Sequence, residues 1–205
     1  MADRGERQLR AGKLLFEVDR ELRLSLGLLR ATLPYPRHGY GGHALVVSPD
    51  ERYLALHLYS GQSEEGWELF ELPSLRHLAS LPYFHGEGTG CRFSPGARWL
   101  ATFTSTAPRV RDTGEYFEDV QDPDADDELV VDWAELRVQR VPDGPIERHT
   151  IGARVARSMD PDELSEWNTY DALSFAGDDA VALQMPWGDT LTVALPIAGA
   201  IVAPS

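Results

Sequence analysis

The clearest pattern along the chain is an apolar segment that ends in a polar turn and is followed by a second apolar segment. It occurs twice: residues 46–55 read VVSPDERYLA and residues 92–101 read RFSPGARWLA, so that Ser48 and Ser94 lie 46 residues apart. Proline presets the backbone torsion φ of the first central turn position, and the following Asp50 or Gly96 tolerates a tight bend. The pattern predicts two β-hairpins with buried strands on both sides of each turn.

A third, weaker copy lies near the C-terminus, where residues 173–183 read LSFAGDDAVAL. Phe175 aligns with Phe93, and glycine and aspartate replace the proline and glycine of the second turn. The spacing between these two copies is 82 residues, and the excess falls on the polar stretch 105–130. We therefore expect this stretch to be an insertion in the second unit.

The second half of the unit, a strand that ends in a turn, also repeats. Residues 66–76 read GWELFELPSLR, and similar segments occupy residues 12–22, 135–144 and 189–196. Self-similarity at this spacing is typical of repeat architectures. Polar residues 1–11 are expected to be frayed or to form a short helix. The whole chain, residues 1–205, is predicted to be one domain, with a half unit at 12–31, a unit at 43–84, a unit at 85–150 that contains the insertion 105–130, and a unit at 168–200.

Over residues 12–196 the repeat resembles the four-stranded blade of WD-repeat and TolB-type β-propellers. Gly42-His43 is similar to the Gly-His pair of WD repeats, and Phe70-Glu71 stands where Trp-Asp would be; Gln139-Arg140 and Ala194-Leu195 depart from that pair. The resemblance implies an all-β fold, a small β-propeller-like repeat protein of three to four blades. Such a ring is closed by the chain itself or completed by dimerisation or a partner. Propellers host unrelated activities, so the resemblance carries no function.

Composition narrows the classes of partner. The formal net charge is −14, which argues against a nucleic-acid backbone or an anionic membrane as the main partner and fits solubility or a basic protein partner. No apolar stretch reaches the about 18 residues of a membrane span. The N-terminus has mixed charge and no apolar core region, so we expect a cytoplasmic protein. The single Cys91 excludes an internal disulfide and is expected to be buried.

The strongest local signal is acidic and lies in the predicted insertion. The spacing of Asp122, Asp124 and Asp126 is superficially that of a calcium loop, but the helpful glycine is missing and the distal glutamate comes too early. The sequence therefore favours a solvated acidic loop and predicts no metal or cofactor. Aromatic anchors beside carboxylates suit a basic protein surface. The candidate partner-binding residues are Arg109, Arg111, Tyr116, Phe117, Asp122, Asp124, Asp126, Asp127, Glu128 and Trp133.

No catalytic residue is predicted, because the sequence has no Gly-x-Ser-x-Gly elbow, no P-loop and no histidine pair at metal-ligand spacing. Three functions stay open. The favoured one is a non-catalytic protein-interaction module, with an acidic inhibitor or immunity-type protein as its concrete version. The second is a hydrolase with carboxylates or histidines at the propeller axis, and the third is a structural subunit of a larger assembly.

Overall fold

The computed structural model describes residues 7–11, 14–18, 23–26, 29–32, 42–59, 64–84, 89–105, 109–110, 128–157, 169–185, 189–197 and 201–202. These residues form an all-β fold of antiparallel sheets with one short helix, α2 (Thr169–Ala172). None of the described helical residues belongs to a segment long and apolar enough to cross a membrane. The chain divides into two compact units, which we describe separately: residues 1–85 with 141–143, and residues 86–140 with 144–205.

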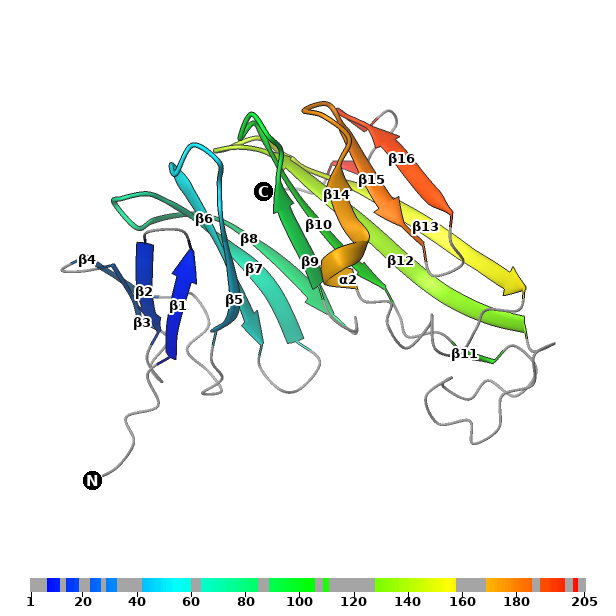
Figure 1. Cartoon of the computed structure of the whole chain (residues 1–205), viewed down its shortest axis with the longest axis horizontal. Coiled ribbons are helices and arrows are strands. Elements are labelled where there is room, and N and C mark those ends of the chain that lie inside the picture. Colours follow the sequence, from blue (N-terminus) through cyan, green and yellow to red (C-terminus); the bar gives the residue numbers. More distant parts are fainter. Residues whose placement is uncertain are drawn as a thin grey trace, which may run out of the picture. The chain divides into compact units, whose positions relative to one another are not determined.

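The first unit contains two four-stranded antiparallel sheets, each in chain order (Figure 1). The expectation that residues 1–11 fray or form a helix is wrong for residues 7–11, which form a strand. This strand pairs with residues 14–18, and the pairing satisfies its backbone hydrogen-bonding groups. This N-terminal sheet spans residues 7–32, whereas the sequence predicted a half unit at 12–31. Its strands are β1 (Arg7–Ala11), β2 (Leu14–Val18), β3 (Arg23–Leu26) and β4 (Leu29–Thr32); the second sheet has β5 (Gly42–Val47), β6 (Tyr53–Tyr59), β7 (Glu64–Glu71) and β8 (Arg76–Phe84).

One face of the β5–β8 sheet forms the apolar core of the first unit. Side chains alternate between the two faces of a strand, so directly paired residues on neighbouring strands share a face. Leu54 pairs with Phe70, and Leu56 pairs with Glu68, which places one carboxylate among buried apolar groups. The buried cluster is Leu54, Leu56, Leu58, Phe70, Leu72 and Leu75, with Leu26, Leu45 and Val47 packed against it.

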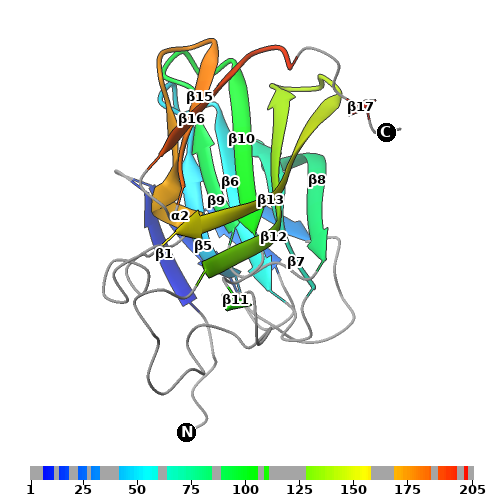
Figure 2. The ribbon, with the colours of Figure 1, turned by 90° about the vertical axis from the view of Figure 1, so that its right-hand side faces the viewer.

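The second unit contains a six-stranded sheet and a three-stranded sheet. The larger has the order β17-β13-β12-β10-β9, with β11 paired to β12, and the smaller has the order β14-β15-β16. The β12–β13 hairpin runs past the end of β10 to the short strand β11 (Figures 1 and 2). The strands are β9 (Thr89–Phe93), β10 (Trp99–Ser105), β11 (Arg109–Val110), β12 (Glu128–Arg140), β13 (Ile146–Arg157), β14 (Leu173–Phe175), β15 (Ala180–Gln184), β16 (Thr190–Ala194) and β17 (Ile201–Val202).

The two sheets of the second unit share one apolar core. Alternate residues of β10 and β12, such as Phe103 and Leu136, pack with residues of β14, β15 and β16, such as Leu173, Val181 and Val193. Burial of the apolar surface of these side chains is the main favourable contribution to the stability of this unit. The opposite face of β12 carries Glu135, Arg137 and Gln139, which are buried polar residues, and the Arg137 guanidinium forms an ion pair with Glu135.

The two strong copies of the turn are confirmed as equivalent hairpins. In the first, the Ser48 N–H donates to the carbonyl of Tyr53 at 2.9 Å and the Tyr53 N–H donates to the Ser48 hydroxyl at 2.9 Å. In the second, Ser94 and Trp99 repeat both bonds, at 2.9 and 3.2 Å. The left-handed residue of each turn is Glu51 or Ala97, with φ of 57° and 54°, one position later than the residue that the sequence singled out for the tight bend.

The third copy of the hairpin is confirmed as well. Residues 173–183 form β14, a turn and β15, but the closing bond from the Ala176 N–H to the Ala180 carbonyl spans one residue fewer, and Gly177 adopts the left-handed conformation with φ of 87°. Of the predicted strand-and-turn segments, β7 and β12 end in turns at residues 72–75 and 141–143, and β16 ends in a bend at residues 195–196; residues 19–22, where the copy at 12–22 was expected to turn, lie outside the described residues. Each of the strands β7, β12 and β16 is followed by a cis X-Pro peptide: Leu72-Pro73, Val141-Pro142 and Leu195-Pro196.

Cys91 is fully buried on β9, as the sequence predicted, and burial raises the pKa of its thiol. The thiolate is the reacting species, so a buried neutral thiol reacts slowly. We expect no reaction of the folded protein with Ellman's reagent over an hour and one equivalent of released thionitrobenzoate in denaturant. Full release from the folded protein would contradict this environment.

Candidate functional site

The structure places only part of the predicted partner-binding set. Arg111, Tyr116, Phe117, Asp122, Asp124, Asp126 and Asp127 lie outside the described residues. Arg109 lies on β11, and Glu128 and Trp133 lie on β12, where the backbone is described. The backbone of these three residues therefore locates the root of the predicted binding segment.

That root is a pair of adjacent strands. Arg109 on β11 pairs with Val130 on β12, and Val110 pairs with Leu129, so the strands on either side of residues 111–127 are adjacent (Figure 1). We call residues 111–127 the acidic insertion. Trp133 lies further along β12, opposite Gly152 of β13. The residues that flank the acidic insertion, Val110 and Glu128, therefore both lie at the distal part of the β12–β13 hairpin.

The acidic insertion concentrates the charge of the chain. It contains eight carboxylates and one arginine, a net charge of −7, which is half of the formal net charge of −14 for all 205 residues. Charges gathered in a short segment at one place create a stronger local potential than the same charges dispersed over the surface. This segment is therefore the main electrostatic feature of the chain.

The structure also reveals a polar cluster that sequence reasoning missed. The Glu68 carboxylate on β7 is 1% exposed, and its Oε2 accepts hydrogen bonds from the Ser80 hydroxyl at 2.7 Å and from His77 Nε2 at 2.6 Å. The Ser80 oxygen and His77 Nε2 are 3.4 Å apart. The other carboxylate oxygen, Oε1, has no hydrogen-bond partner among the described atoms.

Burial controls the acidity of this cluster. It raises the pKa of the Glu68 carboxyl, and the hydrogen bonds from Ser80 and His77 offset this effect only in part. Phe70 contacts the His77 ring edge to face, with 5.4 Å between ring centroids. The His77 side chain is 37% exposed, so the cluster extends from the apolar core to the solvent. A buried carboxylate beside a serine and a histidine has the components of general-base chemistry.

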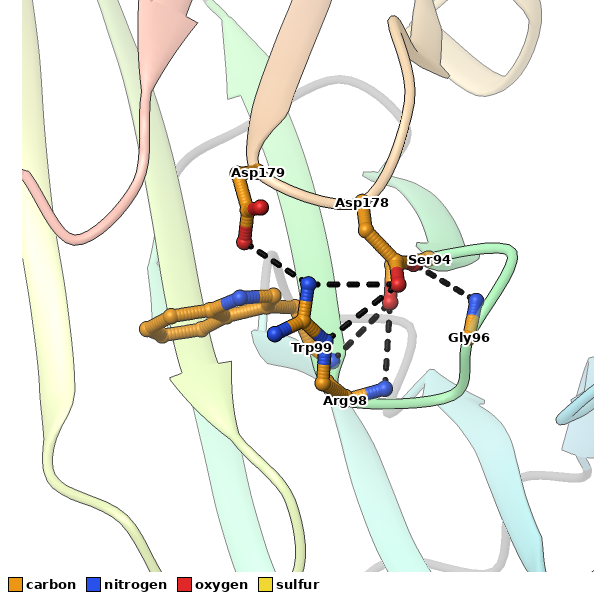
Figure 3. Close-up of polar contacts among 6 residues, drawn as sticks. All are labelled: Ser94, Gly96, Arg98, Trp99, Asp178 and Asp179. Atoms are coloured by element: carbon orange, nitrogen blue, oxygen red, sulfur yellow. Dashed lines mark hydrogen bonds and ion pairs between the residues drawn. The ribbon is translucent and has the colours of Figure 1, made fainter.

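A third polar site joins two hairpin turns of the second unit (Figure 3). The Asp178 carboxylate, from the β14–β15 turn, accepts the Gly96 N–H at 2.6 Å and Arg98 Nε at 3.2 Å, and Arg98 Nη2 donates to Asp179 at 2.9 Å. The Gly96 N–H, the Ser94 hydroxyl and Arg98 hold the pKa of Asp178 below its usual range. These bonds connect the second and third copies of the repeat.

Asp178 supplies a carboxylate to the second turn, as Asp50 does to the first, but it accepts different donors, because the Arg98 N–H, the counterpart of the Arg52 N–H, donates to the Ser94 hydroxyl. Asp50 accepts the Ser48 hydroxyl at 2.7 Å and the Arg52 N–H at 3.2 Å within its own turn. Gly96 occupies the position of Asp50, and the missing carboxylate comes from the neighbouring turn. A Cβ on Gly96 would lie 2.2 Å from Asp178 Oδ2, so only glycine allows this approach.

Metal binding has no support in the described part of the chain, where no three histidine, cysteine, aspartate or glutamate side chains are grouped closely enough to hold an ion. The predicted absence of a metal in the acidic insertion stays a prediction, since residues 111–127 lie outside the described residues.

Comparisons with known proteins add no family. No family model matches the chain, and no curated protein matches it. One solved structure with some similarity is Kuenenia stuttgartiensis hydrazine synthase, with 8% sequence identity, a TM-score of 0.39 and coverage of 90% of this chain and 65% of that chain. A eukaryotic initiation factor has 13% identity and a TM-score of 0.30, and the match covers 99% of this chain and 53% of that chain. A prolyl endopeptidase has 14% identity and a TM-score of 0.23, and the match covers 96% of this chain and 41% of that chain. The chain spans less than two thirds of each of these structures.

Proposed function

We propose that this protein is an interaction module that binds a basic protein surface through the acidic insertion. The observation that carries the proposal is the β11–β12 pairing, which fixes both ends of a segment holding half of the net charge. Loops anchored on a rigid sheet are frequent binding elements. The concrete version is an inhibitor or immunity-type protein of the cytoplasm that covers a basic partner, and this role needs no catalytic residue.

We further propose that the scaffold is a small propeller-like ring in which the antiparallel sheets act as three to four blades. The repeated Ser-Pro turn, its weaker third copy and the bonds between the second and third turns support this arrangement. A ring this small is closed by the chain itself or completed by a second copy or by the partner. The molar mass in solution, measured by light scattering, separates a monomer from a dimer.

Charge and aromatic side chains have separate roles in this proposal. The carboxylates of the acidic insertion attract a basic partner over long distance and accelerate association. Tyr116, Phe117 and Trp133 supply the apolar area that slows dissociation. A mutation in the first group should therefore change the association rate and its salt dependence, and a mutation in the second should change the dissociation rate.

The test first identifies the partner and then removes charge. Tagged protein is used to capture partners from a source-cell lysate at low and high salt, and the basic protein retained at low salt is purified. Replacing Asp122, Asp124, Asp126 and Asp127 by asparagine is expected to slow association about 10-fold at low salt, because steering of this kind accelerates association by about 10 to 10³-fold. Stopped-flow fluorescence measures the rates.

The matched control removes four exposed carboxylates elsewhere, in the variant Glu51→Gln, Asp143→Asn, Asp171→Asn and Asp189→Asn, which has the same net charge. The fold-decrease in the association rate constant of this control should be less than half of that measured for the variant of the acidic insertion. Equal slowing in both variants would show that only overall charge matters and would contradict a binding role for the acidic insertion.

A further inference from the structure

Glu68 is a buried carboxylate that the proposed binding role does not use. Burying a charged group costs free energy, and buried carboxylates are normally paired with a cation or fully hydrogen-bonded. Here the partners are a serine hydroxyl and an imidazole, both on Oε2, while Oε1 has no partner among the described atoms. Leu56, directly opposite on β6, is apolar and buried. The arrangement therefore lowers stability relative to an apolar residue at this position.

A β-bulge assembles the cluster. His77 and Ser80 are three residues apart, so in a regular strand they would lie on opposite faces of the sheet. The pairing of β7 with β8 shifts between Leu69 and Phe70: Phe70 pairs with His77, Leu69 with Ala79 and Glu68 with Ser80, which leaves Leu78 as the extra residue. The bulge turns both polar side chains toward Glu68. Bulges of this kind redirect side chains beside active sites.

We propose that Ser80 is a nucleophile activated by Glu68, in a site that accepts acyl groups from small carboxylic esters. This activity is independent of the acidic insertion and of the binding function proposed above. Ser80 is partly exposed, Glu68 is buried behind it at 2.7 Å, and His77 extends from the same carboxylate oxygen to the surface. His77 is a positioning residue, since its ring bonds the carboxylate and fixes the orientation of Oε2.

The reaction balances with these groups alone. The Ser80 oxygen forms a bond to the ester carbonyl carbon as its proton moves to Glu68 Oε2. The tetrahedral intermediate collapses, the ester C–O bond breaks, and an alcohol leaves with the proton from Glu68. A water molecule then adds to the acyl-serine, its proton moves to Glu68, and the acid is released as Ser80 recovers its proton.

The same hairpin contains a matched comparison. Ser74 donates to Glu71 Oε2 at 2.9 Å, a geometry close to that of Ser80 and Glu68. Glu71 is solvated, and hydrogen bonds from Arg76 and Ser74 hold its pKa below the usual range, whereas burial raises the pKa of Glu68. Glu71 is therefore the weaker base, and Ser74 is expected to stay unreactive.

The experiment uses the full chain and p-nitrophenyl acetate, with p-nitrophenolate release measured by absorbance and the acetylated residue located by peptide mass spectrometry. We expect acetyl transfer to Ser80 and none to Ser74. Ser80→Ala should abolish this modification, Ser74→Ala should leave it unchanged, and Glu68→Gln should slow it about 100-fold, the low end for general-base catalysis. The rate should rise with pH as Glu68 deprotonates.

A positioning role for His77 has its own readout. Its hydrogen bond lowers the pKa of Glu68, so His77→Ala should move the inflection of the pH–rate profile to higher pH. Three results would overturn the proposal: no acetyl group on Ser80 of the folded wild-type chain, equal labelling of Ser74 and Ser80, or an unchanged rate in folded Glu68→Gln. If Glu68→Gln does not fold, the wild-type labelling map and the His77→Ala profile decide the question.

Discussion

Gly96→Asp is expected to destabilise the second unit, and removal of the Asp178 carboxylate from the same chain is expected to restore it. The first new atom, Cβ, would lie 2.2 Å from Asp178 Oδ2, and two carboxylates would then compete for the Gly96 and Arg98 donors. The Asp178 side chain would have to move away and would lose its hydrogen bonds to the Gly96 N–H and Arg98. Asp178→Ala alone also destabilises, because it leaves those donors without their acceptor. In the double variant the new aspartate takes the place that Asp50 has in the first turn.

Urea unfolding followed by circular dichroism measures this cycle. The expected signature is a double variant more stable than either single variant, a non-additivity that only interacting residues show. Asp50→Gly is the matched control, because it removes the carboxylate of the first turn, whose described hydrogen bonds are made to Ser48 and Arg52 of the same turn. Additive losses for Gly96→Asp and Asp178→Ala would mean that Asp178 does not replace the carboxylate missing from the second turn.

The hairpins could be predicted from the sequence because their causes are local. A Ser-Pro turn between two apolar segments contains its own hydrogen-bonding partner, so the closing bonds of Ser48 and Ser94 follow from a few consecutive residues. The strands that end before Pro73, Pro142 and Pro196 were visible for the same reason. Burial of Cys91 followed from its place in a predicted strand.

The remaining features depend on residues far apart in the chain or on pairing register. Gly96 was interpreted as a turn residue, but its backbone needs no left-handed conformation, and the reason for glycine is a carboxylate 82 residues away. The Glu68 cluster depends on the bulge at Leu78, because the bulge places His77 on the same face of the sheet as Ser80. The available signal was one glutamate between Trp67 and Leu69 in an apolar strand, and a single sequence does not show what pairs with it.

The candidate binding site was predictable as a segment but not as a geometry. A run of carboxylates with flanking aromatic residues is evident from composition, and its length marks an insertion. The sequence did not reveal that Arg109 and Val110 pair with the start of β12, because β11 has only two residues. That pairing brings together the two strands that flank the acidic stretch.

Phe103→Ala is expected to cause the largest loss of stability from the core of the second unit. Phe103 is fully buried on β10, opposite Leu136 of β12 and Gly90 of β9. Gly90 has no side chain to fill a space that the ring leaves, so the cavity cannot close from that side. Phe→Ala substitutions in cores cost about 3–5 kcal/mol, a large share of the about 5–15 kcal/mol that stabilises a typical domain.

The free energy of unfolding in urea, extrapolated to water, measures this loss. Phe103→Leu should cost clearly less, because leucine keeps much of the contact with Leu136, and the exposed Thr192→Ala should stay within about 0.5 kcal/mol of the wild type. The slope of unfolding against urea should not change, since the native fold is retained. A Phe103→Ala variant as stable as Thr192→Ala would show that β9 and β10 do not form the packed centre of this unit, and the two-sheet core with Leu173, Val181 and Val193 would be wrong.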